Sequence, residues 1–220
     1  MSLRYPCLVL DHDDTVADST RHVHWPAYKL AMAELRPQMP VLSLQDYFRI
    51  NFQPGFMPYL EEILGLSPAE EKREYEIWQS VVRQRVPAFF PGVPELIRRQ
   101  LAEGGAVCVV SHSVDENIRR DYRENGLPEP TLVFGWEQPR DRRKPAPWPL
   151  EEIMRRLRLD PGDLLMVDDL KPGLDMARAA GVDFAAACWA YDVPEIRQWM
   201  AENSPRCFDT PRALAGWLFA

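Results

Sequence analysis

Short apolar runs recur along the chain, and each of them ends in an acidic, hydroxyl or small residue. Their almost continuous hydrophobic character predicts strands that are covered on both faces, which is typical of a parallel sheet. We interpret five of these runs as strands: CLVLD (7–11), AVCVVS (106–111), TLVFG (131–135), DLLMVD (163–168) and VDFAAAC (182–188).

Amphipathic patterns with helix start and stop signals lie between these runs. Three predicted helices are Pro94–Glu103, Leu150–Leu159 and Gly173–Ala180. A fourth begins at a capping box, Ser113–Glu116, and ends at Gly126. Strands that alternate with helices of this length define the α/β class. We therefore predict a Rossmann-like parallel sheet with helices on both faces and right-handed crossovers.

Residues 17–88 interrupt this alternation, because they carry helical patterns and no convincing strand. A capping box at Ser67–Glu70 opens a long amphipathic run in this region. We predict that residues 1–16 and 89–220 form the α/β core. Residues 17–88 would then form a small all-helical cap, inserted after the first strand, that acts as a lid over the sheet edge.

Aromatic residues gather in this insertion around a Pro54-Gly55 turn. They are Tyr47, Phe48, Phe52, Phe56 and Tyr59. We expect most of these rings to form the insertion's own core. A further hypothesis is that the segment RINFQPGFMPY (49–59), with Arg49 and Phe56, contributes to the choice of substrate.

Composition and charge narrow the class of protein. The 220 residues are 46% hydrophobic and 27% charged, which is typical of a soluble globular chain with a substantial core. A formal net charge of −7 argues against a nucleic-acid partner, and no apolar run approaches the roughly 20 residues of a membrane span. The amino terminus has no signal-peptide pattern, so we expect a cytoplasmic protein, as a monomer or a dimer.

The cysteines follow no metal-binding or redox spacing. They are Cys7, Cys108, Cys188 and Cys207. Because apolar runs surround most of them, we expect buried reduced thiols rather than a disulfide or a zinc site.

Polar residues follow the predicted strands at the points where these strands end. They are Asp11 and Asp13 after the first strand, Ser111 after the second, Asp168 and Asp169 after the fourth, and Lys144 in the loop RDRRKPAPWPL that precedes the fourth. In an open parallel sheet, ligands bind outside the carboxyl ends of the strands. The sequence therefore predicts one polar site at this edge.

Each of these residues has a simpler interpretation when it is taken alone. The pair Asp168-Asp169 would suit a helix cap, and Ser111 would suit an ordinary loop hydroxyl. Lys144 stands beside arginines, which is typical of a solvated basic loop. His22 and His24 match no ligand spacing, and we expect them at the surface or on a helix face.

Taken together, the same residues predict a site for a phosphorylated ligand. Asp11, Asp168 and Asp169 bring three carboxylates to neighbouring strand ends, and this much negative charge favours a hard divalent cation such as Mg²⁺. Lys144 and the Ser111 hydroxyl would supply donors for phosphoryl oxygens.

The order of these motifs resembles the haloacid dehalogenase superfamily. The matching residues are Asp11-His-Asp13-Asp-Thr15, Ser111, Lys144-Pro and Val167-Asp-Asp169. The segments VDDLKPGLDMARAAGV and PGVPELIRRQLAEGGAVCVVSHS are also similar to that superfamily, the second to the phosphatase and phosphoglucomutase type with a helical cap between the first and second motifs. The resemblance covers essentially the whole chain, although the cap matches only in position and helical character.

The resemblance implies roles for the first motif. Asp11 would be the nucleophile that forms an aspartyl-phosphate and also a metal ligand. Asp13 would protonate the leaving oxygen and then activate water, while its backbone carbonyl binds the metal. Dehalogenases of this superfamily lack the second aspartate, because a halide needs no proton to leave, so Asp13 favours phosphate chemistry.

The other motifs carry the remaining roles that the resemblance implies. Ser111 and Lys144 would bind phosphoryl oxygens, and Lys144 would also orient Asp11. Asp169 would be the second metal carboxylate, with Asp168 beside it in the metal shell. The sequence departs from the superfamily at Asp14, where glycine is usual; aspartate tolerates a positive φ, so the turn is expected to survive.

We therefore predict a Mg²⁺-dependent phosphohydrolase that acts on a small phosphorylated metabolite. An alternative is a sugar phosphomutase of the same superfamily, which differs in whether the cap excludes water. A more distant alternative is a phospho-receiver or another non-catalytic signalling domain. There, however, the acidic pair comes early in the chain rather than last.

Overall fold

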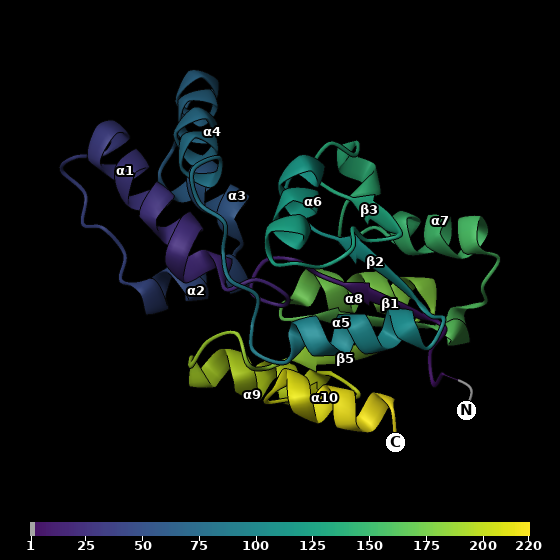
Figure 1. Ribbon diagram of the computed structural model, residues 1–220. Coiled ribbons are helices and arrows are strands. Elements are labelled where there is room, and N and C mark those ends of the chain that lie inside the picture. Colours follow the sequence, from purple (N-terminus) through teal and green to yellow (C-terminus); the bar gives the residue numbers. More distant parts are fainter. Residues whose placement is uncertain (1–2) are drawn as a thin grey trace.

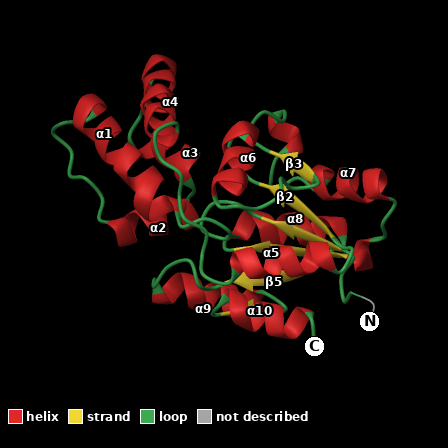
Figure 2. Cartoon of the chain, viewed as in Figure 1, coloured by secondary structure: helices red, strands yellow, loops and turns green. Residues whose placement is uncertain are grey.

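The computed structural model describes residues 3–220 and contains a six-stranded sheet in which every neighbouring pair of strands is parallel (Figures 1 and 2). The strand order is β3-β2-β1-β4-β5-β6. The strands are β1 (Cys7–Leu10), β2 (Ala106–Val110), β3 (Leu132–Phe134), β4 (Leu164–Asp168), β5 (Asp183–Ala187) and β6 (Cys207–Phe208). The five predicted strands are confirmed. β6 was not predicted, because two residues are too short to show a hydrophobic pattern.

Of the helices that cover this sheet, the first four follow the predicted segments, and the last two were not predicted. The helices are α5 (Val93–Ala102), α6 (Asp115–Glu124), α7 (Trp148–Leu157), α8 (Lys171–Ala180), α9 (Pro194–Asn203) and α10 (Pro211–Leu218), with short 3₁₀ turns at Arg140–Arg142 and Pro161–Asp163. The capping box predicted at Ser113 is wrong: Val114 is the N-cap of α6, and the Glu137 carboxylate accepts the Asp115 N–H at 3.2 Å. The capping box at Ser67 is confirmed.

Alternate residues of each strand face opposite layers of helices. Cys7 and Val9 of β1 belong to the hydrophobic cluster that includes residues of α7, α8 and α9. Leu8 and Leu10 belong to the cluster that includes residues of α5, α6 and α10. Because side chains alternate across a strand, an apolar run with both faces buried must be hydrophobic at every position. This explains why the runs could be recognised as strands.

Residues 17–88, which we call the helical segment, contain no strand and lie between β1 and α5. The segment contains a π-helical turn (Thr20–His24), α1 (Trp25–Leu35), α2 (Leu44–Phe52), α3 (Phe56–Pro58), a second π-helical turn (Tyr59–Ile63) and α4 (Pro68–Val82). Figure 1 shows it, in purple and blue, on the side of the molecule toward which the strand arrows point. Among residues 3–220, no helix is long and apolar enough to cross a membrane.

The two ends of the helical segment run side by side where it joins the sheet. Asp18 N donates to the Ala88 carbonyl at 3.0 Å, and Phe90 N donates to the Val16 carbonyl at 2.9 Å. The helical segment is thus joined to the rest of the chain through a narrow paired connection.

The aromatic residues of the helical segment divide into two groups. Tyr47, Tyr59 and Phe56 contribute to the segment's own cluster, as expected. Phe48 and Phe52 instead pack with the cluster on the α7–α9 face of the sheet. The segment therefore contacts the rest of the molecule through aromatic side chains of α2.

A disulfide joins Cys188, just after β5, to Cys207 of β6, so the expectation of reduced thiols is wrong for these two residues. Cys7 and Cys108 are free and buried, as expected. β5 and β6 are adjacent parallel strands, and this pairing brings the two bonded cysteines to a Cα–Cα distance of 6.1 Å. Their separation of 19 residues gave no hint of the bond, because it depends on the pairing of two strands.

Reduction of this disulfide is expected to lower the free energy of unfolding by about 3 kcal/mol, because a closed loop of this length restricts the unfolded chain. Urea unfolding with and without a dithiol reductant measures the difference. The Cys188→Ser/Cys207→Ser double variant is the control, and its stability should not respond to the reductant. An equal response of wild type and variant would show that the bond does not contribute.

Candidate active site

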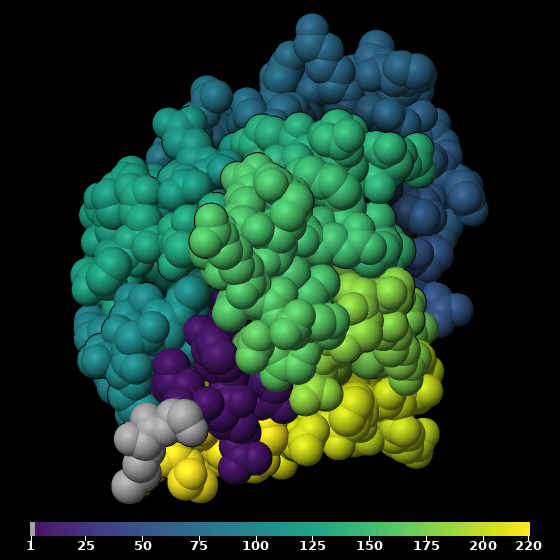
Figure 3. All heavy atoms as spheres, turned by 90° about the vertical axis from the view of Figure 1, so that its right-hand side faces the viewer, coloured from purple at the N-terminus to yellow at the C-terminus, as the bar shows by residue number. Residues whose placement is uncertain are grey.

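The polar residues predicted at the strand ends lie at one edge of the sheet. Asp11 and Ser111 directly follow β1 and β2, while Asp168 ends β4 and Asp169 follows it. β1 pairs in parallel with both β2 and β4, so the carboxyl ends of the three strands must meet. This edge faces the helical segment; Figure 3 views the opposite end, where the green part of the chain that contains α7 covers much of the face.

Three buried carboxylates form the centre of this edge. Asp11, Asp168 and Asp169 each offer an oxygen, and these oxygens all lie within 4.8 Å of one another. Lys144 Nζ lies 2.9 Å from Asp11 Oδ1 and 2.8 Å from Asp168 Oδ2. Although burial opposes its charge, the two carboxylates raise the pKa of Lys144 above its ordinary value, so the ammonium stays protonated.

The charges of this cluster do not balance, because one ammonium faces three carboxylates. Asp11 Oδ1 is buried and accepts no hydrogen bond of normal geometry, although it is ion-paired with Lys144. A set of oxygen ligands with excess negative charge is what a hard divalent cation requires. The residues therefore fit such a cation.

Asp168 already has a partner for each of its oxygens. Leu170 N donates to Oδ1 at 2.8 Å, and Lys144 donates to Oδ2 at 2.8 Å. Burial raises the pKa of the Asp168 carboxyl to about 6, against the opposing effect of Lys144. Gly173 permits the close packing of α8 on this carboxylate, since a Cβ there would lie 2.1 Å from Asp168 Oδ2.

Asp169 is held by two hydroxyl groups that come from different parts of the chain. Thr15 Oγ1 donates to Oδ1 at 3.1 Å, and the Tyr191 hydroxyl donates to Oδ2 at 3.1 Å. Burial and the neighbouring carboxylates of Asp168 and Asp11 raise the pKa of Asp169 well above its ordinary value. A cation bound here would reverse this effect by favouring the carboxylate. Thr15 was part of the predicted first motif, whereas Tyr191 was not predicted.

Asp13 has a partner that the sequence did not predict. His24 Nε2 donates to Asp13 Oδ1 at 2.9 Å, and Trp78 Nε1 donates to His24 Nδ1 at 3.0 Å. Because Trp78 supplies a hydrogen to Nδ1, the proton of the neutral imidazole must lie on Nε2. Burial raises the pKa of the Asp13 carboxyl, but the interaction with His24 outweighs this, and the pKa lies below its ordinary value.

His22 is at the surface, with a side chain that is 60% exposed, and His24 is on a helical turn, with a side chain that is 15% exposed, so both agree with the expected surface or helix-face positions. His24 lies in the π-helical turn at the start of the helical segment, and Trp78 lies in α4. Neither spacing nor local pattern could join these two residues to Asp13, since three separate parts of the chain meet there.

Asp14 adopts φ of +58°, so the turn keeps the left-handed conformation expected where glycine is usual. Its Oδ1 accepts the backbone N–H of Thr20 at 3.1 Å. The side chain therefore gives the turn a second function, which is to hold the start of the helical segment. Burial raises the pKa of the Asp14 carboxyl to about 7, against the opposing effect of the hydrogen bond from Thr20.

Ser111 and Lys144 are both buried at this edge, at 4% and 8% exposure. Ser111 Oγ accepts the Ser113 N–H at 3.2 Å. His112, which was not predicted, donates from Nε2 to the Lys144 carbonyl at 3.0 Å and so holds the backbone of the lysine loop. Burial and the nearby Lys144 charge lower the pKa of His112 to about 4, so the ring is neutral. In the sequence, only the position of His112 directly after Ser111 could have indicated that it belongs to the site.

Arg49 does not reach the carboxylate cluster. It forms ion pairs with Asp46, at 2.8 Å, and with Glu195 of α9. Phe56 lies in the helical segment's own cluster. These contacts give no support to the hypothesis that Arg49 and Phe56 contribute to the choice of substrate.

Comparisons with known proteins agree with this fold. A family model for haloacid dehalogenase-like hydrolases matches residues 8–187. The chain is 32% identical over 98 residues to a bifunctional riboflavin kinase/FMN phosphatase of Arabidopsis thaliana; the match covers 44% of this chain and 26% of that protein. The chain therefore spans about a quarter of that relative's length.

Solved structures cover the chain more completely. A predicted phosphoglycolate phosphatase of Haemophilus somnus superposes with a TM-score of 0.79 at 16% identity, over 99% of both chains. CbbY of Rhodobacter sphaeroides, in complex with xylulose-(1,5)bisphosphate, superposes with a TM-score of 0.73 at 18% identity, over 96% of this chain and 95% of that one. At these sequence identities, the similarity to the two solved structures shows a shared fold and nothing more. With the family match over most of its length, the chain belongs to the haloacid dehalogenase-like hydrolases.

Glu74 of α4 provides a test of the electrostatics in the helical segment. Its side chain is buried, and burial raises the pKa of the carboxyl to about 7, with only His24 opposing. A folded-state pKa above the unfolded value means that the folded protein binds the proton more tightly. The associated stability is present below about pH 4 and is lost as the pH rises through 7.

We expect Glu74→Gln to raise the free energy of unfolding at pH 8.5 by up to about 3 kcal/mol and to change it little at pH 4. Chemical unfolding at both pH values measures this difference. Glu76→Gln is the matched control, since Glu76 is an exposed acid of the same helix. A stabilisation of Glu74→Gln that is equal at the two pH values would contradict the assignment.

Proposed function

We propose that the protein is a Mg²⁺-dependent phosphohydrolase that cleaves a small phosphomonoester through an aspartyl-phosphate on Asp11. The observation that carries this proposal is the buried cluster of three carboxylates with Lys144 ion-paired to Asp11. The names of similar proteins, an FMN phosphatase and a predicted phosphoglycolate phosphatase, are consistent with phosphate ester chemistry.

In the first step, a carboxylate oxygen of Asp11 attacks phosphorus while the bond from phosphorus to the leaving oxygen breaks. Asp13 gives a proton to the leaving oxygen, so the alcohol departs neutral. In the second step, Asp13 takes a proton from water, and the resulting nucleophile attacks the phosphorus of the aspartyl-phosphate. Inorganic phosphate leaves, and Asp11 is restored as a carboxylate.

The hydrogen bonds around Asp13 support its role as general acid and base. The hydrogen bond from His24 fixes the orientation of the carboxylate, and the Trp78 indole fixes the tautomer of His24. Because His24 stabilises the carboxylate form, Asp13 must gain its proton once the phosphoryl group, with its negative charge, is nearby. His24 would then be displaced or would share its hydrogen with the leaving group.

Lys144 and Ser111 would bind the phosphoryl oxygens. Lys144 already lies against Asp11, so it would also keep the attacking carboxylate in place. The hydrogen bond to Asp168 holds the ammonium of Lys144, and the hydrogen bond from His112 holds its backbone carbonyl. A fixed ammonium costs little reorganisation when charge develops on the phosphoryl oxygens.

Mg²⁺ would be held by the Asp11 and Asp169 carboxylates and the Asp13 carbonyl, with Asp168 beside them. Asp11 fits best, because its Oδ1 accepts no hydrogen bond of normal geometry, whereas each oxygen of Asp168 and Asp169 already has a donor. When bound, the ion neutralises the charge of the carboxylates and polarises the phosphoryl group.

The helical segment would act as the cap of this site. Asp11, Asp169 and Lys144 are at most 8% exposed, so a substrate requires the segment to move before it can enter. The paired connection at Ala17 and Phe89 is a suitable hinge. Closure excludes bulk water from the reacting groups, and product analysis would separate hydrolysis from transfer of phosphate within a sugar.

A cytoplasmic location remains a prediction of the sequence. The Cys188–Cys207 bond bears on it, because disulfides are rare in reducing compartments. Thiol titration of protein isolated under alkylating conditions would show whether this bond exists in the cell.

The function is tested by phosphate release from a panel of phosphorylated metabolites and p-nitrophenyl phosphate. We expect Asp11→Asn to lower kcat by about 10³-fold or more, because it removes the nucleophile, and chelation of Mg²⁺ to have a comparable effect. Asp18→Asn is the matched control, since Asp18 lies in the same acidic stretch and, within residues 3–220, pairs with His22 alone. Absence of Mg²⁺-dependent release across the panel, or an unaffected Asp11→Asn enzyme, would refute the proposal.

A further inference from the structure

One edge of α2 packs the helical segment against α9 and the loop after β5. The Phe48 ring lies 4.4 Å from the Tyr191 ring, and Phe52 lies 5.4 Å from Trp199 of α9. The ion pair between Arg49 and Glu195 belongs to the same contact. We call these residues the α2 contact.

Lys171, the first residue of α8, completes this contact from the side of the sheet. Its Nζ donates to Gln53 Oε1 at 2.7 Å, and it lies 4.0 Å from the Phe52 ring centroid and 4.7 Å from that of Trp199. Aromatic contacts, an ion pair and a cation–π contact thus combine in a small area. The α2 contact is a specific docking of the helical segment onto α8, α9 and the loop after β5.

Tyr191 joins this contact to the carboxylate cluster. Its ring stacks on Phe48, while its hydroxyl donates to Asp169, 3.1 Å from Oδ2 and 3.2 Å from the carbonyl oxygen. The residue is 8% exposed. One side chain therefore has its apolar face on the helical segment and its polar end on a residue suited to hold the cation.

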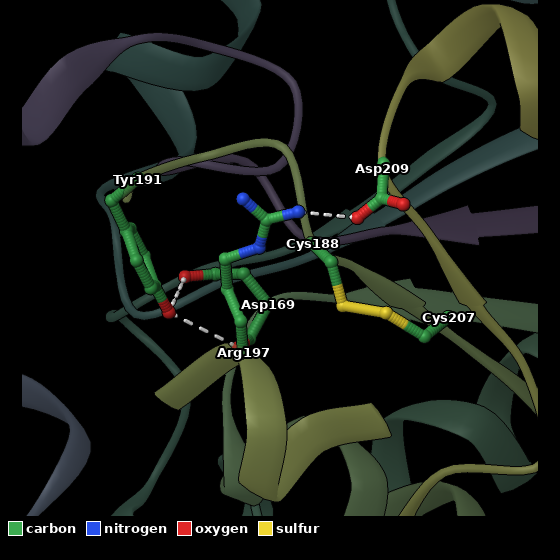
Figure 4. Close-up of a disulfide and its surroundings, with 6 residues drawn as sticks. All are labelled: Asp169, Cys188, Tyr191, Arg197, Cys207 and Asp209. Carbon is green, nitrogen blue, oxygen red and sulfur yellow. Dashed lines mark hydrogen bonds and ion pairs between the residues drawn. A yellow bond between two sulfur atoms is a disulfide. The ribbon is translucent and has the colours of Figure 1, made fainter. Parts of the chain in front are cut away.

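The loop that carries Tyr191 is anchored on both sides, as Figure 4 shows. The Cys188–Cys207 disulfide fixes its start, and the Arg197–Asp209 pair, at 2.5 Å, links α9 to the residue after β6. Trp189 Nε1 donates to the Thr15 carbonyl at 3.1 Å, and the Thr15 hydroxyl is the other donor to Asp169. With the backbone held in this way, the remaining freedom of Tyr191 is that of its ring.

We propose that Tyr191 is a positioning residue that orients Asp169 for the divalent cation when the helical segment is closed. In the closed state, Phe48 confines the Tyr191 ring and so keeps its hydroxyl on Oδ2, which fixes the orientation of the Asp169 carboxylate. When the segment opens, the ring loses this contact and Asp169 loses one of its two hydroxyl partners. Cation binding and closure then favour each other, because a coupling between two events is reciprocal.

This proposal rests on the proposed function only for the identity of the cation, and its test does not require turnover. Calorimetric titration of the substrate-free protein with Mg²⁺, repeated with Mn²⁺ by electron paramagnetic resonance, measures the affinity directly. We expect Tyr191→Phe, which keeps the ring, to weaken binding about 10-fold, as loss of a hydrogen bond to a metal ligand typically does.

Tyr5→Phe is the matched control, because the Tyr5 hydroxyl donates to the Asp183 carboxylate at 2.6 Å, outside the cluster. It should leave the affinity for both ions unchanged. Phe48→Ala tests the link from the other side, since it removes the ring contact and leaves every group around Asp169 in place. We expect it to weaken binding in wild type and to have no further effect in a Tyr191→Phe background, because both changes interrupt the same path.

The proposal is overturned if Tyr191→Phe binds the ions as tightly as wild type, if Tyr5→Phe weakens binding equally, or if the effects of Tyr191→Phe and Phe48→Ala are additive. Wild type that binds neither ion also overturns it. Tyr191-dependent binding without any phosphate release would support the coupling and refute the phosphohydrolase. Phosphate release together with an unchanged cation affinity in Tyr191→Phe would support the phosphohydrolase and refute the coupling.

Discussion

Repulsion among three buried carboxylates is the constraint on which the rest of the site depends. Asp11, Asp168 and Asp169 are brought together because β1 and β4 are neighbours, and no local rearrangement could separate them. Such a cluster is costly inside a protein unless opposite charge is supplied. Lys144 supplies part of it through two ion pairs, and the remaining negative charge makes the site receptive to a divalent cation.

The surrounding structure keeps this unfavourable arrangement in place. Each carboxylate oxygen of Asp168 and Asp169 has a donor, and those donors come from the residue before α8, the first motif, the lysine loop and the loop after β5. Gly173 lets α8 approach Asp168, and the disulfide at Cys188 anchors the loop that carries Tyr191. The helical segment lies on this side of the sheet, with Phe48 of α2 packed against Tyr191. Stability, charge compensation and access to the site are thus properties of the same few contacts.

The fold could be predicted from the sequence because its signals are local. Strands with both faces buried give continuous apolar runs, and helix caps give short motifs, so the five longer strands and the helices α4 to α8 were recognised. The capping box at Ser113 failed because Glu137, from a different loop, accepts the Asp115 N–H instead. β6 was missed because pairing with β5, rather than any pattern of its own, makes it a strand.

The sequence by itself determined which residue types stand at the ends of the strands, and hence that acids, a hydroxyl and a lysine meet at one edge. Only the tertiary structure decided how they are partnered. His24 and Trp78 reach Asp13, Tyr191 reaches Asp169, and Cys188 meets Cys207, in each case by contact between different elements of the fold. The physical reason is that periodicity encodes which face of an element is buried. Partners far apart in sequence depend instead on strand order, register and the docking of the helical segment.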